Sequence, residues 1–66
     1  MKIRYFSGTD TLFIELRDVA AASTRELDEN TLVEVDADGQ VAAITIEHAS
    51  ERAGIPEVSY EEVTAS

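Results

Sequence analysis

The chain has 66 residues, no cysteine and a formal net charge of −9 at pH 7, from fourteen Asp and Glu against five Lys and Arg. A chain of this length forms one small domain at most, and neither a disulfide nor a thiolate metal site is available to compensate for its small core. The charge disfavours direct binding to nucleic acid or to anionic membranes, because both rely on Lys and Arg that neutralise phosphates.

The amino-terminal part is predicted to form a β-hairpin. Charged and apolar residues alternate over residues 2–6, which is typical of a half-buried strand. Turn-forming residues occupy positions 7–10, and the alternation resumes over residues 11–16, which predicts a second strand. Since the chain has no apolar stretch of the length that a signal peptide or a bilayer span needs, we expect a cytoplasmic protein.

Three further strands are predicted in the middle of the chain. Residues 17–22 are interpreted as a loop that leads into a short strand over residues 23–27, and the polar residues 28–30 end that strand. Residues 32–46 (LVEVDADGQVAAITI) then contain two alternating apolar runs on either side of the sequence DADG at 36–39. This pattern is the clearest β-hairpin signal in the chain.

The register of this hairpin has two alternative forms. In the first, residues 38–39 are a two-residue type I′ loop, and Val35 pairs with Ala42. The sheet then has one apolar face, which collects Val33, Val35, Ala42, Ile44 and Ile46.

In the second form, residues 36–39 are a type I turn whose glycine adopts the left-handed conformation as a bulge. Val35 then pairs with Val41. Leu32 lies opposite Ile44, and both faces of the sheet are partly apolar. Asp at the first turn position and Gly at the fourth favour this second form.

A short helix and a tail are predicted at the carboxy terminus. Residues 48–53 contain helix formers, and Gly54 can stop the helix in the left-handed conformation. We therefore place a single β-rich domain at residues 1–53 and a poorly ordered acidic tail at 54–66, where residues 59–62 have the capping-box spacing of one last helical turn. The predicted class is α+β, mainly β: a small antiparallel β-meander sheet with a short C-terminal helix.

Apolar side chains on both sides of the predicted sheet indicate that the chain has a partner. A one-sided register would leave the apolar surface of Phe6, Phe13, Leu32 and Val41 exposed, and one short helix cannot cover two sheet faces. We therefore expect a homodimer or a complex with a small basic protein, the latter being favoured by the negative net charge.

The single histidine, His48, is the residue best suited to metal or acid–base chemistry. Together with Glu47 and Glu51 it could form a weak metal- or small-ligand-binding site, although a lone His with helix-spaced Glu is more commonly a surface pair. A hydrolytic set of His48 with Ser50 and Asp36 lacks a nucleophile elbow and an oxyanion loop. Our main prediction is therefore a protein that is not an enzyme and holds no cofactor or metal.

The carboxylates elsewhere in the chain have simpler interpretations. Residues 36–39 are similar to the start of a calcium loop, but the fifth and twelfth positions of such a loop fall on Gln40 and Glu47, with a strand between them. A turn explains the same residues. The carboxylates that recur through the sheet region, Asp36 included, are expected to provide solubility and to protect strand edges. The alternative is a negative surface that captures a basic, nuclease-like partner. The carboxylates of the sheet region considered in both interpretations are Glu15, Asp18, Glu26, Asp28, Glu29, Glu34 and Asp36.

The chain carries a series of short motifs in a fixed order, namely MKIRY at 1–5, TDTLFIEL at 9–16, DADG at 36–39, ITI at 44–46 and AS at 49–50. As a set, these motifs resemble a small prokaryotic family of domains of unknown function over residues 1–53. The resemblance implies a compact antiparallel sheet with a short carboxy-terminal helix and no assigned enzymatic activity. It also implies an antitoxin-like role, as the partner of a small toxin-like protein, and it brings no functional residues to this sequence.

Overall fold

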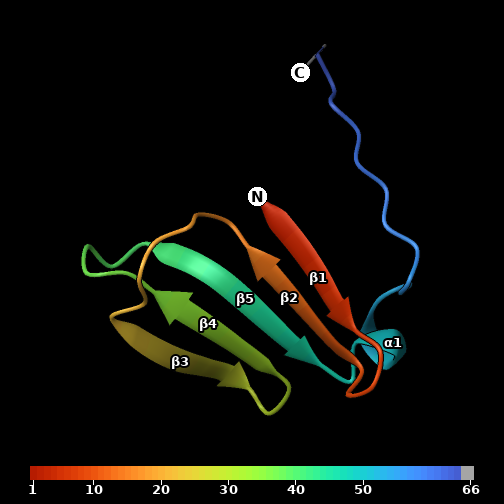
Figure 1. Cartoon of the computed structure of the whole chain (residues 1–66), viewed down its shortest axis with the longest axis horizontal. Coiled ribbons are helices and arrows are strands. Elements are labelled where there is room, and N and C mark those ends of the chain that lie inside the picture. Colours follow the sequence, from red (N-terminus) through yellow and green to blue (C-terminus); the bar gives the residue numbers. More distant parts are fainter. Residues whose placement is uncertain (65–66) are drawn as a thin grey trace.

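The computed structural model of the chain describes residues 1–64. It contains a single sheet and one short helix (Figure 1). In this part of the chain, no helix has the length and apolar character needed to cross a membrane. The elements in chain order are β1 (Lys2–Phe6), β2 (Thr11–Glu15), β3 (Ser23–Asp28), β4 (Thr31–Val35), β5 (Val41–Glu47) and α1 (Ala49–Arg52).

The five strands form one antiparallel sheet in the order β1-β2-β5-β4-β3. The strands β3, β4 and β5 form a meander, and β5 then pairs with β2 from the first hairpin. The segment between β2 and β3 crosses one end of the sheet, where the Leu16 N–H donates to the Ala42 carbonyl (2.8 Å) and the Ala22 N–H donates to the Val35 carbonyl (2.8 Å). The predicted class, α+β and mainly β with a short C-terminal helix, is confirmed.

The turn between β4 and β5 has the second of the two predicted forms. The Asp36 N–H donates to the Gln40 carbonyl (2.9 Å), and the Gly39 N–H donates to the Asp36 carbonyl (3.1 Å). Gly39 has a φ of 80°, in the left-handed region that favours glycine. Val35 consequently pairs with Val41, as this form of the turn requires.

Beyond the turn, a β-bulge changes the register. Ala42 has no partner in β4, so Val33 lies opposite Ile44 and Leu32 lies opposite Thr45. The expectation that Leu32 would face Ile44 is therefore wrong, because the extra residue in β5 moves every later pair by one position. The turn follows the second predicted form, whereas most of the ladder follows the first.

This register gathers the apolar side chains on one side of the sheet, which we call the apolar face. One row runs across four strands from Ile3 through Ile14 and Ile44 to Val33, and a second row runs from Tyr5 through Leu12 to Ile46. Successive side chains of a strand alternate between faces, so these rows share one face. With Val35, the apolar face comprises Ile3, Tyr5, Leu12, Ile14, Val33, Val35, Ile44 and Ile46.

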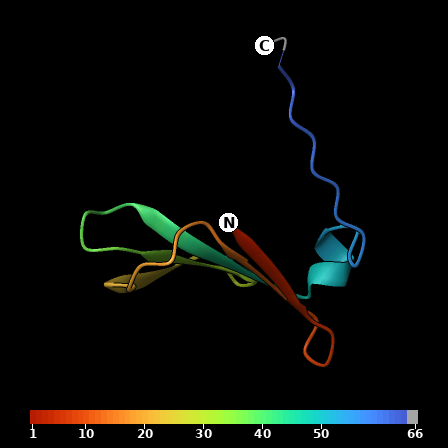
Figure 2. The same ribbon diagram turned by 45° about the horizontal axis from the view of Figure 1, so that its top comes forward.

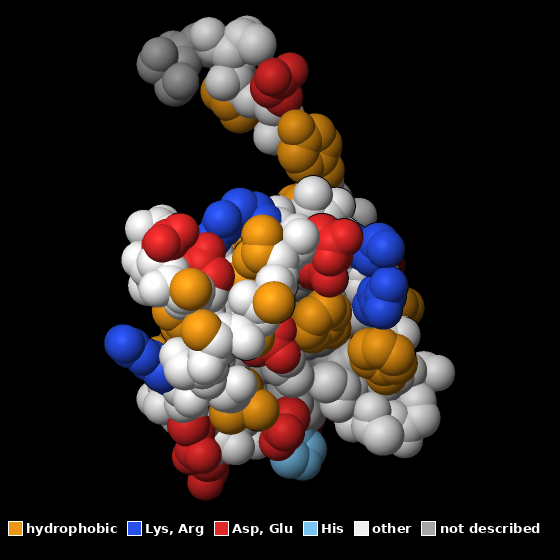
Figure 3. Space-filling view, turned by 60° about the vertical axis from the view of Figure 1, so that its left-hand side comes forward, with side chains coloured by type: hydrophobic (Ala, Val, Ile, Leu, Met, Phe, Trp, Pro, Cys, Tyr) orange, Lys and Arg blue, Asp and Glu red, His pale blue; other side chains and the backbone are white. Residues whose placement is uncertain are grey.

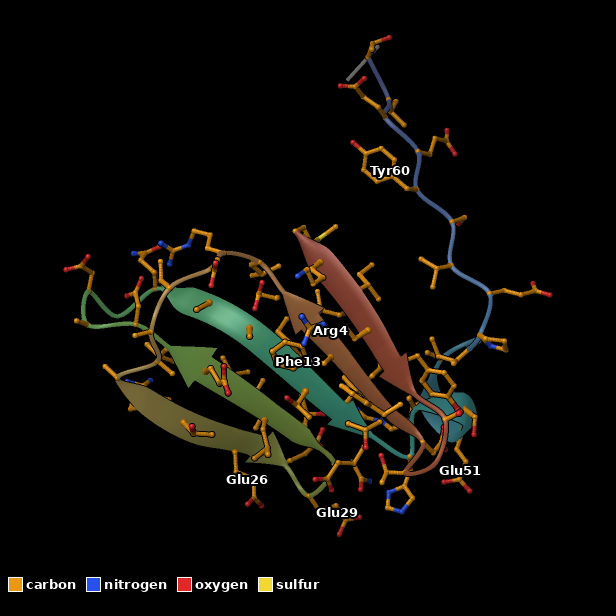
Figure 4. All side chains as sticks on the ribbon, in the orientation of Figure 1. Arg4, Phe13, Glu26, Glu29, Glu51 and Tyr60 are labelled. Carbon is orange, nitrogen blue, oxygen red and sulfur yellow. The ribbon has the colours of Figure 1, made fainter. Side chains whose placement is uncertain are left out.

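The opposite side, which we call the charged face, alternates apolar and ionised side chains. Its central row runs from Arg4 and Phe13 on β1 and β2 (Figure 4) to Thr45, Leu32 and Glu26 on β5, β4 and β3. A parallel row contains Lys2, Glu15, Ala43, Glu34 and Thr24. As expected, Phe6, Phe13 and Leu32 lie away from the main apolar face, whereas Val41 lies opposite Val35 on the apolar side.

The helix and the segment after it differ in detail from the predictions. The helix α1 ends at Arg52, and the next residue, Ala53, is extended. The only glycine with positive φ among residues 1–64 is Gly39, so the left-handed stop expected at Gly54 is wrong. The helical turn expected at residues 59–62 does not form, because residues 58–64 are extended. Of the predicted tail 54–66, the last two residues lie outside the described part of the chain.

The core is small because the sheet is a single layer. Three of its buried residues are alanines, and no large side chain among residues 1–64 is fully buried. A stable domain normally packs a second layer against the apolar side of a sheet. Here, only the short helix α1 occupies that position, and it lies at one end of the sheet (Figure 2). The buried residues are Leu12, Val33, Val35, Ala42, Ala43 and Ala49.

Candidate functional site

The apolar face spans four neighbouring strands of the sheet, β1, β2, β5 and β4. Its centre is shielded by neighbouring side chains, since Val33 is only 6% exposed, whereas Ile3 at the β1 edge is 41% exposed. Ile14 and Ile44, between them, are half-buried. Residues 1–64 enclose no pocket, so the apolar face is an open surface.

The helix α1 is tied to the sheet by Asp10, which lies in the turn between β1 and β2. The Asp10 backbone has a φ of 54°, a left-handed conformation that Asp adopts more readily than most residues. Its carbonyl accepts the Ala49 N–H (2.9 Å). Its carboxylate accepts the Tyr5 hydroxyl (2.6 Å), the Ser50 N–H (3.0 Å) and the Ser50 hydroxyl (2.7 Å). Because Tyr5 points to the apolar face, Asp10 holds the start of α1 on that side.

These hydrogen bonds change the acidity of both partners. Donation from the Tyr5 hydroxyl, followed by donation from Ser50, lowers the pKa of Asp10 below its usual value. The same hydrogen bond to Asp10 is the main reason why the pKa of Tyr5 is raised. The carboxylate form of Asp10 is therefore the form that the folded protein prefers, and both of its oxygens accept hydrogen bonds within the fold.

A second group of contacts anchors the other end of the helix. The Arg52 guanidinium donates to the Asn30 carbonyl (3.2 Å) and to the Thr31 hydroxyl (2.7 Å), and it lies 3.5 Å from the Asp28 carboxylate. Donation from the Asn30 N–H is the main cause of the lowered pKa of Asp28. The helix thus bridges the β1–β2 turn and the β3–β4 turn, and it leaves the rest of the apolar face uncovered.

The predicted ligand set of Glu47, His48 and Glu51 does not converge. The His48 ring Nδ1 lies 2.9 Å from the Asn30 amide oxygen, and the His48 backbone is left-handed (φ 55°) as the residue before α1. Glu51 lies on the outside of the helix (Figure 4). Within residues 1–64, no three His, Cys, Asp or Glu side chains gather in a way that would hold a metal ion.

The hydrolytic combination of His48, Ser50 and Asp36 is also separated. The Ser50 hydroxyl donates to Asp10, so it does not contact the histidine. Asp36 precedes β5 and His48 follows it, so a strand of seven residues lies between them. The geometry therefore offers no assembled catalytic group from these residues.

Asp36 has the structural role that the turn interpretation predicts. One carboxylate oxygen accepts the N–H groups of Asp38 and Gln40 (both 2.9 Å), and the other accepts the Arg17 guanidinium at 2.6 Å. The Gln40 N–H is the largest cause of the lowered pKa of Asp36, with Arg17 next. Both Asp36 oxygens accept hydrogen bonds within the fold, as expected for a turn residue.

The predicted negative surface is divided between several places. Glu15 and Glu34 are half-buried on the charged face. Glu26 and Glu29 lie at the β3 side of the sheet (Figure 4). Asp18 is exposed in the segment between β2 and β3. The carboxylates therefore do not form one continuous negative surface on either face of the sheet.

Sequence reasoning missed the contacts of Asp10, Asn30 and Arg52. Asp10 and Ser50 are 40 positions apart in the chain, so no local spacing relates them. Asp10 was predicted only as a turn residue, and the Ala-Ser sequence at 49–50 was noted only as one of the short motifs. The motifs at residues 9–16 and 49–50 were the available signal, because the structure places their polar residues against each other.

The sequence matches one protein-family model. Residues 2–50 match the family described as protein of unknown function (DUF2283). The chain belongs to this family. The matched region ends at Ser50, so it includes the whole sheet and both partners of the Asp10–Ser50 contact, but not the tail. Comparison with curated proteins and with solved structures returned no match.

Proposed function

We propose that this protein of the DUF2283 family is a non-enzymatic interaction module of the cytoplasm, and that the apolar face of its sheet binds a second copy of the chain. The observation that carries this proposal is the single-layer architecture, in which aligned rows of Ile, Leu and Val are covered at one end only by a four-residue helix. Packing two such faces together supplies the second layer that each chain lacks.

The amount of exposed surface fits this arrangement. The accessible surface of the chain is 5025 Å², whereas a compact monomer of this mass exposes about 4,100 Å². The single-layer sheet and the projecting tail both contribute to the difference of about 900 Å². A specific protein interface buries about 800 Å² on each partner, and the sheet and the tail together expose an excess of that order.

Two substitutions on the same strand test which face is used. Ile3 on the apolar face and Phe6 on the charged side are both in β1 and are similarly exposed, at 41% and 49%. We expect Ile3→Lys to weaken the dimer about tenfold or more, because the ammonium group would be desolvated in an apolar interface. Phe6→Lys should not weaken the dimer, because Phe6 lies on the opposite side of the sheet. Light scattering after size exclusion, over a range of concentrations, measures both effects.

The outcome for the wild-type chain decides between occupants of the apolar face. A wild-type monomer at high concentration would show that a second copy does not bind there. The remaining proposal would then be an antitoxin-like complex with a small basic protein, which the formal charge of −9 favours. Equal effects of the two lysine substitutions would show that self-association does not use the apolar face.

A further inference from the structure

The segment after the helix projects from the body of the molecule. The Glu57 N–H donates to the Gly54 carbonyl (3.0 Å), and residues 58–64 form no hydrogen bond with the rest of the described chain. Its apolar side chains are strongly exposed: Val58 is 59% exposed, Tyr60 83% and Val63 62%. Figure 3 shows hydrophobic and acidic side chains of this tail standing clear of the body. An extended segment with such side chains has the composition of a strand without a neighbour.

The edge strand β1 offers a vacant place for such a segment. It pairs with β2 on one side and has no neighbour on the other. The tail begins beside the end of β1 and runs in the opposite direction to β1 (Figure 1), which is the polarity of an antiparallel pair. However, the tail diverges from the sheet on the same side as α1, so it leaves the β1 edge of its own chain unpaired (Figure 2).

Charge distinguishes β1 from the other edge strand, β3. The side chains Lys2 and Arg4 make β1 basic within an acidic chain. In β3, Arg25 is outnumbered by acidic residues. The tail carries Glu57, Glu61 and Glu62 and no basic residue up to position 64. The tail is thus complementary to β1 and repelled by β3, and the positive charges also oppose pairing of two β1 edges.

The side-chain pattern defines a register for this pairing. If residues 57–61 run antiparallel to β1 with Glu61 opposite Lys2, then Tyr60 lies opposite Ile3 and Val58 lies opposite Tyr5. Because strand side chains alternate, Val58 and Tyr60 extend the apolar face. The carboxylates of residues 57 and 61 then share the charged face with the basic side chains of β1. One register therefore places the apolar tail residues on the apolar face and the acidic ones near the basic side chains of β1.

We propose that residues 57–61 of one chain add as a sixth strand to the β1 edge of a second copy, in a reciprocal exchange. This proposal rests on the self-association proposed above, and it assigns to the tail a contact at the β1 edge, beside the apolar face. Reciprocal exchange between two copies forms a closed two-fold dimer, whereas one-way addition would form open chains. Main-chain hydrogen bonds provide the affinity, as in other cases of strand addition to a sheet edge.

Engineered cysteines test the exchange directly, because the chain has no cysteine of its own. In the proposed register Ser59 lies opposite Arg4, so the variant Arg4→Cys/Ser59→Cys places two thiols on neighbouring strands. After mild oxidation, we expect a covalent dimer on a non-reducing gel. The matched control, Thr24→Cys/Ser59→Cys, places the first cysteine on the β3 edge. It should give several-fold less covalent dimer.

The other outcomes would overturn the exchange. A disulfide-closed monomer would show that the tail pairs with its own β1. Equal cross-linking in the β3 control would show that the tail has no preference for β1. If light scattering finds a dimer but the variant with cysteines on β1 and the tail does not cross-link, then the exchange fails while self-association through the apolar face stands.

Discussion

Asp10 is the residue on which the position of the helix depends. It combines a left-handed backbone, a carboxylate that accepts hydrogen bonds from Tyr5 and Ser50, and a carbonyl that accepts the Ala49 N–H. Hydrogen bonds to an ionised acceptor are stronger than those between neutral groups. Because the helix itself has only four residues, it has little stability of its own, and contacts such as these hold it in place.

The Asp10→Asn variant is expected to lower the midpoint of thermal unfolding by several degrees at neutral pH. The pKa of Asp10 is lower in the folded protein than in the unfolded chain, so its ionisation stabilises the fold above the ordinary Asp pKa of about 4. That contribution disappears as the pH falls through the lowered pKa. The difference between wild type and variant should therefore narrow in acid, as measured by thermal unfolding from pH 7 to pH 2.

A matched substitution shows whether this pH dependence is specific to the contacts between Asp10 and the helix. Asp18 lies in the exposed segment between β2 and β3, away from the helix. Asp18→Asn should follow the wild-type curve of unfolding midpoint against pH. A constant gap between wild type and Asp10→Asn at every pH would contradict the role given to the Asp10 carboxylate.

At the scale of the elements, the β4–β5 hairpin determines how the sheet presents its side chains. The turn at residues 36–39 leaves Val35 opposite Val41, and the bulge at Ala42 then returns the ladder to a register in which Val33 lies opposite Ile44. Without the bulge, a one-residue shift would send apolar side chains of β4 and β5 to opposite faces. The apolar face therefore depends on both the turn and the bulge.

Gly39→Ala tests the turn. The φ of 80° at Gly39 is unfavourable for any residue with a Cβ, although no atom lies within 4 Å of the position that a Cβ would occupy. We expect a loss of about 1 kcal/mol in the free energy of unfolding, from backbone strain alone. Gly54→Ala is the control, because that site also has open space but no positive φ. It should change stability by less than about 0.5 kcal/mol. Urea unfolding of both variants gives the comparison.

At the scale of the whole molecule, the chain forms one of the two packed layers that a domain usually contains. Its sheet has a nearly continuous apolar face, yet its buried residues include three alanines and no large, fully buried side chain among residues 1–64. Chains of this size commonly require an additional source of stability, and this chain has no disulfide. Association of two apolar faces is therefore expected to contribute to folding as well as to function.

Concentration dependence of stability follows from this coupling. If folding and dimerisation are linked, the midpoint of thermal unfolding rises with protein concentration, because mass action favours the associated state. We expect such a rise for the wild-type chain and for Phe6→Lys, and a flat dependence for Ile3→Lys. Calorimetry over a hundredfold range of concentration is the measurement. A flat dependence for the wild type would show that the monomer folds without its partner.

Most strand positions were predictable from residue alternation, whereas contacts between distant segments were not. The alternation over residues 2–6 matches β1 at both ends, and the DADG sequence correctly indicated the turn at 36–39. The bulge at Ala42 was not predicted, because two registers satisfy the same local pattern and only the pairing of β5 with β2 and β4 distinguishes them. The candidate ligands around His48 were close in sequence, yet the His48 ring contacts Asn30, 18 positions away in the chain.

The sequence by itself determined the strand content, the acidic composition, the missing cysteines and the left-handed turn at Gly39, since each depends on the composition or on a few neighbouring residues. Only the tertiary structure decided the strand order, the rows of the apolar face and the hydrogen bonds from Ser50 to Asp10. These features join segments that lie up to 40 positions apart, and long-range pairing is selected by the burial and hydrogen bonding of the whole sheet.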